Sequence, residues 1–283
     1  MTKDEYDRWA AELDCEVGPV EGAVNARAKA PQNGVVISCG ADLRPKPVQW
    51  LWPDWLALGK FHLLAGAPGQ GKTTIAIGLA ATVTVGGRWT DGSRCPQGNV
   101  LIWSGEDDYT DTLLPRPIAA GADAKRAYFI DGTREAGKVR LFAPSSDMSK
   151  LKAAIEHIGD VRMIVIDPVS TVVAGDSHKN TEVRRGVQPL VDLATSINAA
   201  LLGITHLSKG GQGTDPAQRV IGSIAFTAVA RVVLVAARVQ SDDGEDKRIL
   251  ARRKSNIGPD NGGFEYHQAQ VEALPGINAS RIE

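Results

Sequence analysis

The sequence is poor in cysteine, and its three cysteines, Cys15, Cys39 and Cys95, lie far apart along the chain. They form no Cys-x-x-Cys pair and no cluster with histidine, which excludes the common zinc-site patterns and a disulfide framework. Cysteine use of this kind is typical of proteins in a reducing compartment, so we expect a cytoplasmic protein.

The chain also lacks a surplus of charge and long apolar runs. Its formal net charge is −1, so no overall positive field attracts nucleic acid, and any such contact must come from local patches. No apolar run approaches the roughly 18 residues that a membrane-spanning helix requires. The opening "MTKDEYDRWAAELD" is charged, unlike a secretory signal. We therefore expect no membrane partner.

Strand-like and helix-like patterns alternate from residue 60 onward. Strands are predicted at 61–65, 99–104, 127–130, 162–167, 199–205 and 231–237, and helices near 72–85, 108–121, 148–158 and 182–197. Such alternation predicts an α/β fold with a mostly parallel twisted sheet and helices on both faces. "KRILARRKS" and "GFEYHQAQV" flank the turn "NIGPDNG", which predicts an antiparallel hairpin at the sheet edge.

The segments outside this pattern set the expected domain boundaries. Residues 1–47 are interpreted as a short amphipathic helix at 2–14 and an arm or linker rich in Gly, Ala and Pro. A nucleotide-binding domain is expected over 48–274, and a C-terminal tail over 275–283. "VQWLWPDWLALG" (48–59) holds three of the six tryptophans, which either pack in the core or stack on bases.

A glycine-rich loop joins the first predicted strand to the first predicted helix. It reads Gly66-Ala67-Pro68-Gly69-Gln70-Gly71-Lys72-Thr73 and fits the phosphate-loop pattern in the strand–loop–helix context that this motif requires. Glycines leave the backbone free to point N–H groups at a polyphosphate, and the helix that continues from Thr74 directs its N-terminus at the anion. Lys72 is expected at the β- and γ-phosphates and Thr73 at Mg²⁺, so the loop predicts ATP and Mg²⁺ as ligands.

Two further predicted strands end in acids. "VRMIVIDPVS" places Asp167 at a carboxyl end, where it suits a ligand of the Mg²⁺ shell opposite Thr73. "NVLIWSGEDD" places Glu106 just past a strand end, where a carboxylate can deprotonate a water in line with the γ-phosphate. Asp107 and Asp108 are interpreted as solvated or capping residues, with Asp107 the alternative base.

A third strand end carries a histidine. "ALLGITHLSKG" ends its predicted strand at Thr205 and His206. A histidine at that edge can donate a hydrogen bond to the γ-phosphate and sense its loss, although a lone histidine is more often a satisfied polar group.

With these residues in order, the chain resembles the RecA-like ATPases, and within them the RepA/DnaB-type hexameric replicative helicases. The resemblance covers about residues 48–270 and depends on "GAPGQGKTT", "LIWSGEDD", "VIDPVS", "ITHLSKG", "QRVIGSIAFTAVARVVLV" and the terminal hairpin. It implies a RecA-like core in which Glu106 is the catalytic base, Asp167 the metal-binding aspartate and His206 the phosphate sensor.

The resemblance also implies a homo-oligomer, a hexamer, in which a neighbour completes each site. Arg219 in "QRVIGS" corresponds to the family's arginine finger. Arg252 and Lys254 in "ILARRKSNIG" correspond to a basic pair on one strand face, with Arg253 the alternative if the register differs by one. Tyr266 in "GGFEYHQ" corresponds to a tyrosine that stacks on adenine.

Two basic loops are expected to face single-stranded DNA in the pore of such a ring. One is 174–186, with Lys179, Arg184 and Arg185, and the other is 208–219, with Lys209. Both could equally be ordinary flexible loops. The resemblance leaves a primase or an initiator protein open as a further partner. The alternative function is an ATPase switch that binds a partner protein or DNA without unwinding.

Overall fold

The computed structural model describes residues 35–173, 179–206, 224–240 and 246–283. The chain divides into two units, Met1–Lys46 and Pro47–Glu283, and each is described by itself. In the first unit, the described residues 35–46 are exposed and contain one helical turn, Gly40–Asp42. The helix expected at 2–14 lies outside the described residues.

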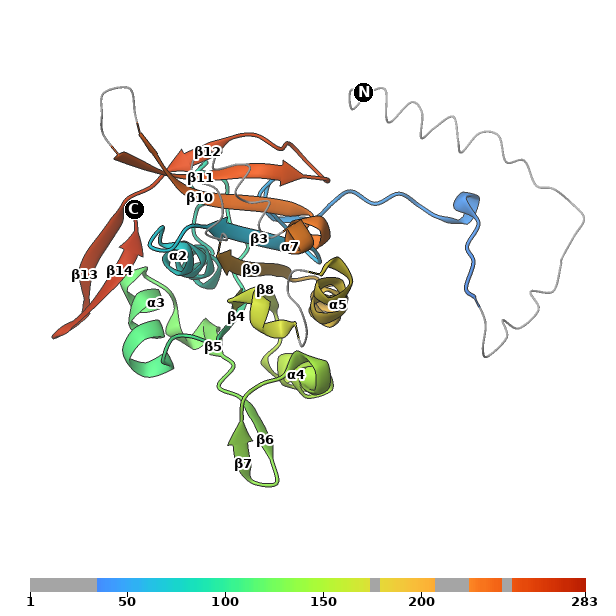
Figure 1. Ribbon diagram of the computed structural model, residues 1–283, viewed down its shortest axis with the longest axis horizontal. Coiled ribbons are helices and arrows are strands. Elements are labelled where there is room, and N and C mark those ends of the chain that lie inside the picture. The colour runs from blue at the N-terminus through green and yellow to red at the C-terminus, as the bar shows by residue number, and fades with distance from the viewer. Residues whose placement is uncertain (1–34, 174–178, 207–223, 241–245) are drawn as a thin grey trace, which may run out of the picture. The chain divides into compact units, whose positions relative to one another are not determined.

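An eight-stranded sheet forms the centre of the second unit, in the order β12-β11-β10-β3-β9-β8-β4-β5 (Figure 1). The strands from β10 to β5 in this order run parallel. Their bounds are β3 Phe61–Gly66, β4 Asn99–Ser104, β5 Ala127–Phe129, β8 Val161–Asp167, β9 Ala200–His206 and β10 Val232–Gln240. β11 (Asp246–Ser255) and β12 (Gly263–Glu265) continue the sheet antiparallel. The predicted α/β class and the antiparallel edge are confirmed.

Helices cover both faces of the sheet because its strands bury side chains on both sides. Along β3, Phe61 and Leu63 pack in one core cluster with α4 (Pro144–Ile158), α5 (Asn180–Ile197) and α7 (Ile224–Val229). Leu64 packs in the other cluster with α2 (Lys72–Val85) and with Trp52, Trp55 and Trp89. Figure 1 shows α2 on one side of the sheet and α4, α5 and α7 on the other. No helix in the described part is long and apolar enough to cross a membrane.

The predicted helix 108–121 is the element that the structure corrects. It is broken into a π-type turn, Tyr109–Leu113, and the short helix α3 (Pro115–Ala119). Pro115 and Pro117 supply no backbone N–H to a helix that would run through them, which explains the break. In contrast, α2 begins and ends where the sequence predicted, and α4 begins earlier than predicted because Pro144 starts it.

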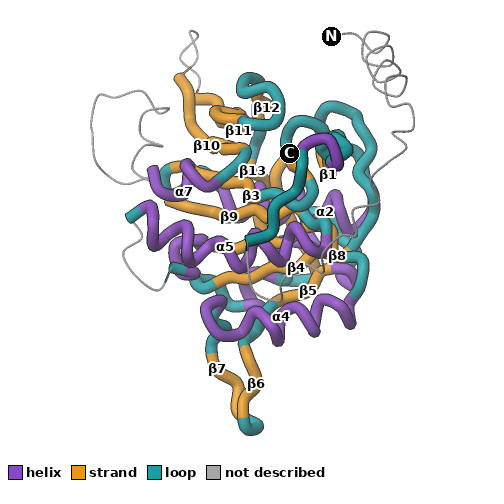
Figure 2. Tube along the Cα trace, turned by 90° about the vertical axis from the view of Figure 1, so that its right-hand side faces the viewer, coloured by secondary structure: helices purple, strands orange, loops and turns teal. Residues whose placement is uncertain are grey.

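Three small antiparallel pairs were missed by the strand prediction. β1 (Trp50–Trp52) pairs with β2 (Leu56–Ala57), and β6 (Thr133–Glu135) pairs with β7 (Lys138–Arg140) in a hairpin that projects beyond α4 (Figure 2). β13 (Gln268–Leu274) pairs with β14 (Ile277–Ile282). The residues expected as a tail, 275–283, therefore supply a paired strand.

The tryptophans of segment 48–59 pack in the protein. Trp52 stacks on Trp55 and Trp89, with ring centroids 4.8 and 4.9 Å apart, and its indole donates a hydrogen bond to Asp91. Both Trp52 and Trp55 are buried. This confirms the packing interpretation for these two residues and leaves them no free face on which a base could stack.

Candidate functional site

The phosphate loop connects the end of β3 to the start of α2. Gly69 and Gly71 have φ angles of 76° and 72°, a region that residues with a side chain rarely adopt. A Cβ on Gly66 would lie 2.6 Å from the carbonyl oxygen of Ala236 on the neighbouring strand β10. The three glycines therefore have backbone reasons to be glycine, and the loop turns into the N-terminus of α2 as an anion site requires.

Lys72 is the first residue of α2 and is buried at its base. Its Nζ donates a hydrogen bond to the carbonyl oxygen of Ala67, 3.0 Å away, so the ammonium lies over the loop. Burial lowers the pKa of Lys72, and the negative charges of Asp167 and Glu106 oppose that change. The cation thus lies near two carboxylates, as a group placed beside a polyphosphate and its metal should.

Thr73 and Asp167 meet as the sequence predicted. The Thr73 hydroxyl donates a hydrogen bond of 2.6 Å to Asp167 Oδ2 at the end of β8. Burial raises the pKa of Asp167, while the Thr73 bond lowers it. Among the described residues no group of three or more His, Cys, Asp or Glu could hold a metal ion. One hydroxyl and one carboxylate suit Mg²⁺, which keeps waters and binds substrate phosphates besides a few protein oxygens.

Glu106 and His206 lie at the same edge of the sheet. His206 ends β9 directly opposite Gly66 of β3, and Ser104 of β4 is opposite Asp167 of β8. Glu106 follows β4 by two residues, and its Oε2 is 4.0 Å from His206 Nε2. Their side chains are 56% and 46% exposed, so both remain accessible to a ligand and to water.

The acids beside Glu106 are engaged elsewhere. Asp107 forms a 2.8 Å ion pair with Arg116, and Asp108 accepts hydrogen bonds from the backbone N–H groups of Thr110 and Asp111 as the cap of the next turn. Asp108 is thus a capping residue, as interpreted from the sequence, whereas Asp107 is paired with Arg116. Glu106 is the acid of the three that points to His206.

Tyr109 fixes the loop that carries Glu106. Its hydroxyl lies 2.7 Å from the carbonyl oxygen of Ile130 and 3.1 Å from that of Ser104, so it joins the end of β4 to the chain after β5. The Ser104 hydroxyl accepts from the N–H groups of Glu106 and Asp107. Sequence reasoning missed Tyr109, because its partners come together only through the pairing of β4 with β5.

The residues at this edge fit a nucleoside triphosphate with Mg²⁺. The backbone of the loop and Lys72 suit phosphates, Thr73 and Asp167 suit the cation, and Glu106 suits a water that attacks the terminal phosphate. When bound, the metal would neutralise charge on the phosphates. The protein's part is to hold these groups at one edge of a rigid sheet.

Tyr266 lies beside the phosphate loop and is buried. Its residue is 4% exposed, and its hydroxyl donates a 2.5 Å hydrogen bond to the carbonyl oxygen of Gln70. Burial raises the pKa of this hydroxyl. The predicted stacking on adenine is therefore corrected: the buried ring supports the loop from behind.

The C-terminal hairpin also supports the loop, which sequence reasoning missed entirely. The side chain of Gln268 lies against Gly71, where an added Cβ would be 3.3 Å from its Oε1, and it accepts a hydrogen bond from Arg248. The hydroxyls of Ser280 and Thr74 are 3.2 Å apart. No sequence signal indicated these contacts, because β14 falls in the residues assigned to a tail.

The expected role of Arg252 at the site of a neighbouring subunit is corrected, because its contacts lie within its own chain. It is 6% exposed, donates to the carbonyl oxygens of Asp54 and Asn261 at 3.0 and 2.6 Å, and lies 4.9 Å from the ring centre of Trp55. A side chain held in this way does not reach into a neighbouring molecule. It joins β11 to the β1–β2 turn and to the loop before β12.

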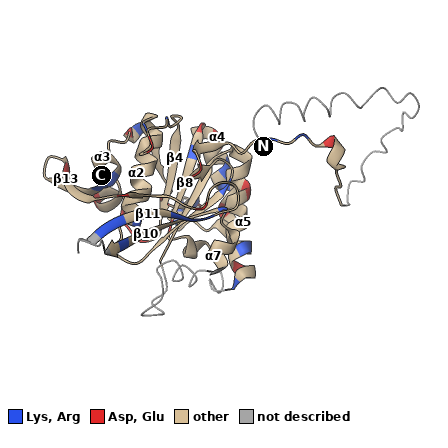
Figure 3. Ribbon diagram, turned by 90° about the horizontal axis from the view of Figure 1, so that it is seen from above, with Lys and Arg blue, Asp and Glu red and all other residues tan. Residues whose placement is uncertain are grey.

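Lys254 likewise forms its hydrogen bonds within its own chain. Its Nζ donates to the carbonyl oxygens of Thr227 and Ala230 at 2.6 and 3.2 Å, at the C-terminal end of α7, where a cation is favourable. Desolvation lowers the pKa of Lys254. Arg253, between the two, is exposed at a register shift of β11, and no described residue forms a hydrogen bond or ion pair with its side chain. Figure 3 shows basic residues along these strands.

The predicted DNA-facing loop at 174–186 is partly a helix. Arg184 and Arg185 lie exposed on the first turns of α5, whose hydrogen bonding begins at Lys179, and Lys179 is 3.9 Å from Glu182. Lys209 and Arg219 lie outside the described residues.

Comparisons with known proteins agree with this geometry. A family model described as an AAA domain matches residues 26–212, a range that contains the phosphate loop, Glu106, Asp167 and His206. A search of curated proteins found no match. Among solved structures, a KaiC-like protein from the hyperthermophilic archaeon Pyrococcus horikoshii OT3 is similar, with a TM-score of 0.53 and 18% identity over 83% of this chain and 99% of that chain. At this identity the likeness shows a shared fold.

Proposed function

The chain belongs to the AAA domain family and has the fold of a RecA-like phosphate-loop ATPase, and from this premise we propose that it is an ATP-driven motor. The specific proposal is a hexameric DNA helicase of the RepA/DnaB type, which translocates on single-stranded DNA. Lys72, Thr73, Asp167, Glu106 and His206, from four neighbouring strand ends, lie at one edge of the sheet, and this convergence carries the proposal.

Each of these side chains has one role in the proposed reaction. Lys72 holds the charge of the β- and γ-phosphates, and Thr73 with Asp167 orients the Mg²⁺ shell. Glu106 accepts a proton from the attacking water, which becomes bonded to the γ-phosphorus as the bond to ADP breaks. His206, 4.0 Å from Glu106, reports the loss of the phosphate to the end of β9.

A motor also needs a cation at the transition state, and we propose that a neighbouring copy supplies it. Arg219 remains a candidate from the sequence. The exposed, unpaired side chain of Arg253 supports it as the second candidate, in place of Arg252 and Lys254. A finger of this kind is worth about 10³-fold or more in rate, so hydrolysis would depend on assembly.

Single-stranded DNA is the proposed track. Arg184 and Arg185 are exposed on α5, and Lys179 and Lys209 complete the basic set proposed from the sequence. Contacts from such residues are directed at phosphates, so binding should weaken steeply with salt and show little base preference.

The test is strand displacement on a forked DNA duplex with ATP and Mg²⁺, with Lys72→Ala as the matched control. We expect ATP-dependent displacement by the parent protein and none by the variant. Hydrolysis without displacement would exclude the helicase and leave an ATPase switch. Absence of hydrolysis at concentrations where light scattering shows an assembled ring would exclude the ATPase itself.

Mixing two inactive variants tests whether the site is shared. The Lys72→Ala variant retains Arg253, and the Arg253→Ala variant retains an intact phosphate loop. Mixed assemblies therefore contain some interfaces at which both groups are present. ATP turnover should therefore recover partly at intermediate mixing ratios. If neither this mixture nor the equivalent one with Arg219→Ala recovers, the shared site is excluded.

A further inference from the structure

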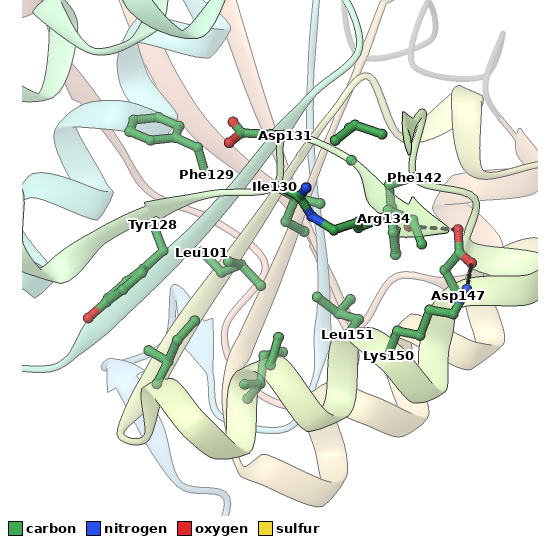
Figure 4. A pocket seen from close by; sticks show the side chains of 16 residues that line it. Leu101, Tyr128, Phe129, Ile130, Asp131, Arg134, Phe142, Asp147, Lys150 and Leu151 are labelled. Atoms are coloured by element: carbon green, nitrogen blue, oxygen red, sulfur yellow. Dashed lines mark hydrogen bonds and ion pairs between the residues drawn. The ribbon is translucent and has the colours of Figure 1, made fainter. Parts of the chain in front are cut away.

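A cavity of about 550 Å³ lies at the far end of the sheet from β12 (Figure 4). Its walls come from β4, the chain around β5, the β6–β7 hairpin and α4. The volume is within the range of small-molecule sites. None of the residues assigned above to the nucleotide site lines it.

The floor of the cavity is apolar. Leu101, Ile130, Phe142, Leu151, Ile155 and Ile158 line it. All except Ile158 are buried, and the two helix residues Leu151 and Ile155 face the sheet from α4. A floor of this composition favours an apolar ligand body.

The charged residues near the cavity are mostly paired with one another. Asp147, fully buried, accepts hydrogen bonds from Arg140 at 2.6 and 2.7 Å and from Thr133 at 2.9 Å. Lys150 is 3.6 Å from both Asp147 and Glu135. These contacts join the base of the hairpin to α4. Each of these charged side chains has an oppositely charged partner, so none of them needs a ligand.

Arg134 is different. It lines the same cavity, its side chain is exposed, and no described residue forms a hydrogen bond or ion pair with it. Figure 4 shows its side chain extending from the hairpin toward Ile130, above the apolar floor. The guanidinium thus supplies a cation with five donors beside the apolar floor of the cavity.

We propose that this cavity binds a small molecule with an apolar body and one anionic group. The apolar body occupies the floor between Leu101 and Leu151, and the anionic group pairs with Arg134. Asp131 also lines the cavity, and its negative charge disfavours a second anionic group. This site is independent of nucleotide binding, so its test does not rely on ATP hydrolysis.

Two matched dyes test both halves of the proposal on the full chain. 8-Anilinonaphthalene-1-sulfonate has an apolar body and one anionic group, and N-phenyl-1-naphthylamine is the same body without the charge. Fluorescence titration should show saturable binding of the sulfonate with one dye per chain. The uncharged dye should bind more weakly, by about tenfold, which corresponds to about 1.4 kcal/mol.

Substitutions that fill the cavity test whether the two dyes bind there. Ala154→Trp fills the cavity from α4, and Ala153→Trp, at an exposed neighbouring position that does not line it, is the control. Val139→Trp fills the cavity from the hairpin in case the first variant misfolds. Both filling variants should weaken the two dyes more than about tenfold, and the control should not. If a folded filling variant binds the sulfonate as the parent does, the dye is elsewhere and the proposal is wrong.

Arg134→Met keeps the apolar stem and removes the charge, and Lys138→Met is its control on the same hairpin. Arg134→Met should weaken the sulfonate by about tenfold and leave the uncharged dye within about twofold, since the substitution removes the cation that pairs with the sulfonate and keeps the apolar stem. Equal weakening of both dyes, or of neither, would overturn the role of Arg134.

Discussion

Two regions of the sheet carry dense sets of charged side chains, and they use them differently. At the carboxyl ends of β3, β4, β8 and β9, Glu106 and His206 lie 4.0 Å apart with exposed side chains, and Lys72 donates a hydrogen bond to one backbone carbonyl oxygen, that of Ala67. Near the C-terminal end of β11, Arg252 and Lys254 each donate hydrogen bonds to two backbone carbonyl oxygens.

The difference lies in what surrounds each set. Parallel strands leave their carboxyl ends without further strand partners, so side chains there face an open edge where a ligand can satisfy them. β11 pairs with β10 on one side, and the β1–β2 turn, the loop before β12 and the end of α7 supply the backbone carbonyl oxygens that accept hydrogen bonds from Arg252 and Lys254. The accessible charged side chains Glu106 and His206 therefore lie at the open edge of the sheet, whereas Arg252 and Lys254 bind backbone carbonyl oxygens within the fold.

The largest effect is expected from Glu106→Gln. The amide keeps the shape but cannot accept the proton of water at neutral pH, so turnover should fall about 10²- to 10⁴-fold while nucleotide binding persists. Steady-state ATPase rates and binding of a fluorescent nucleotide measure the two effects separately.

Asp107→Asn is the control for Glu106→Gln. Asp107 is paired with Arg116, so its loss should change the rate by only a few-fold. The assignment of the base would be wrong if the Asp107 variant lost hydrolysis and the Glu106 variant kept it.

Arg252→Ala and Arg253→Ala compare a bound and a free cation on one strand. Arg252→Ala leaves the carbonyl oxygens of Asp54 and Asn261 without their partner, and should lower the free energy of unfolding by about 3–4 kcal/mol. Arg253→Ala should stay within about 0.5 kcal/mol of the parent. Urea unfolding followed by tryptophan fluorescence measures both, and equal losses would contradict the division between them.

The sequence predicts the nucleotide edge well because each group there is tied to a motif. The span of α2, the ends of β4 and β8 and the meeting of Thr73 with Asp167 all follow from strand ends and a glycine loop. Glu106 is preferred over Asp107 as the base from its position in the sequence, and this choice stays a prediction, while the structure pairs Asp107 with Arg116.

Positions that depend on long-range packing could not be predicted. Whether Arg252 meets solvent or Asp54 depends on where the β1–β2 turn packs, 198 residues earlier in the chain. Tyr266 and Gln268 meet the phosphate loop only because the C-terminal hairpin folds back on α2. A residue type and its spacing carry no information about either contact.

Two histidines on neighbouring strands show the same difference between the open edge and the interior of the sheet. His206 is exposed at the carboxyl end of β9, whereas His62 is fully buried in β3, where its Nε2 accepts from the N–H of Ala57 at 2.8 Å. Burial lowers the pKa of His62 from 6.5 to about 4. Between these pH values the unfolded chain binds a proton that the folded chain does not, so stability should fall as pH falls, by about 3 kcal/mol at most.

The measurement for His62 is urea unfolding from pH 7 to pH 4.5, in the parent and in His62→Gln, whose amide does not titrate. Other groups titrate in both proteins, so the difference between the two curves isolates His62. That difference should shrink steadily as pH falls below about 6.5, because only the parent loses stability through this residue. A constant difference would mean that His62 takes up its proton in the folded protein.

The smallest expected effect belongs to an uncharged residue at the nucleotide edge. Tyr109→Phe removes only the hydroxyl that joins the carbonyl oxygens of Ser104 and Ile130, and the ring can keep its contact with Phe129. One hydrogen bond is worth about 1 kcal/mol, so the loop that carries Glu106 should loosen and kcat should fall about three- to tenfold. KM for ATP should hardly change, because Lys72 and Thr73 are untouched. Tyr128→Phe, at a neighbouring tyrosine outside this loop, is the control. A fall in stability with kcat unchanged would show that Tyr109 only holds the fold together, and that the edge positions its base without it.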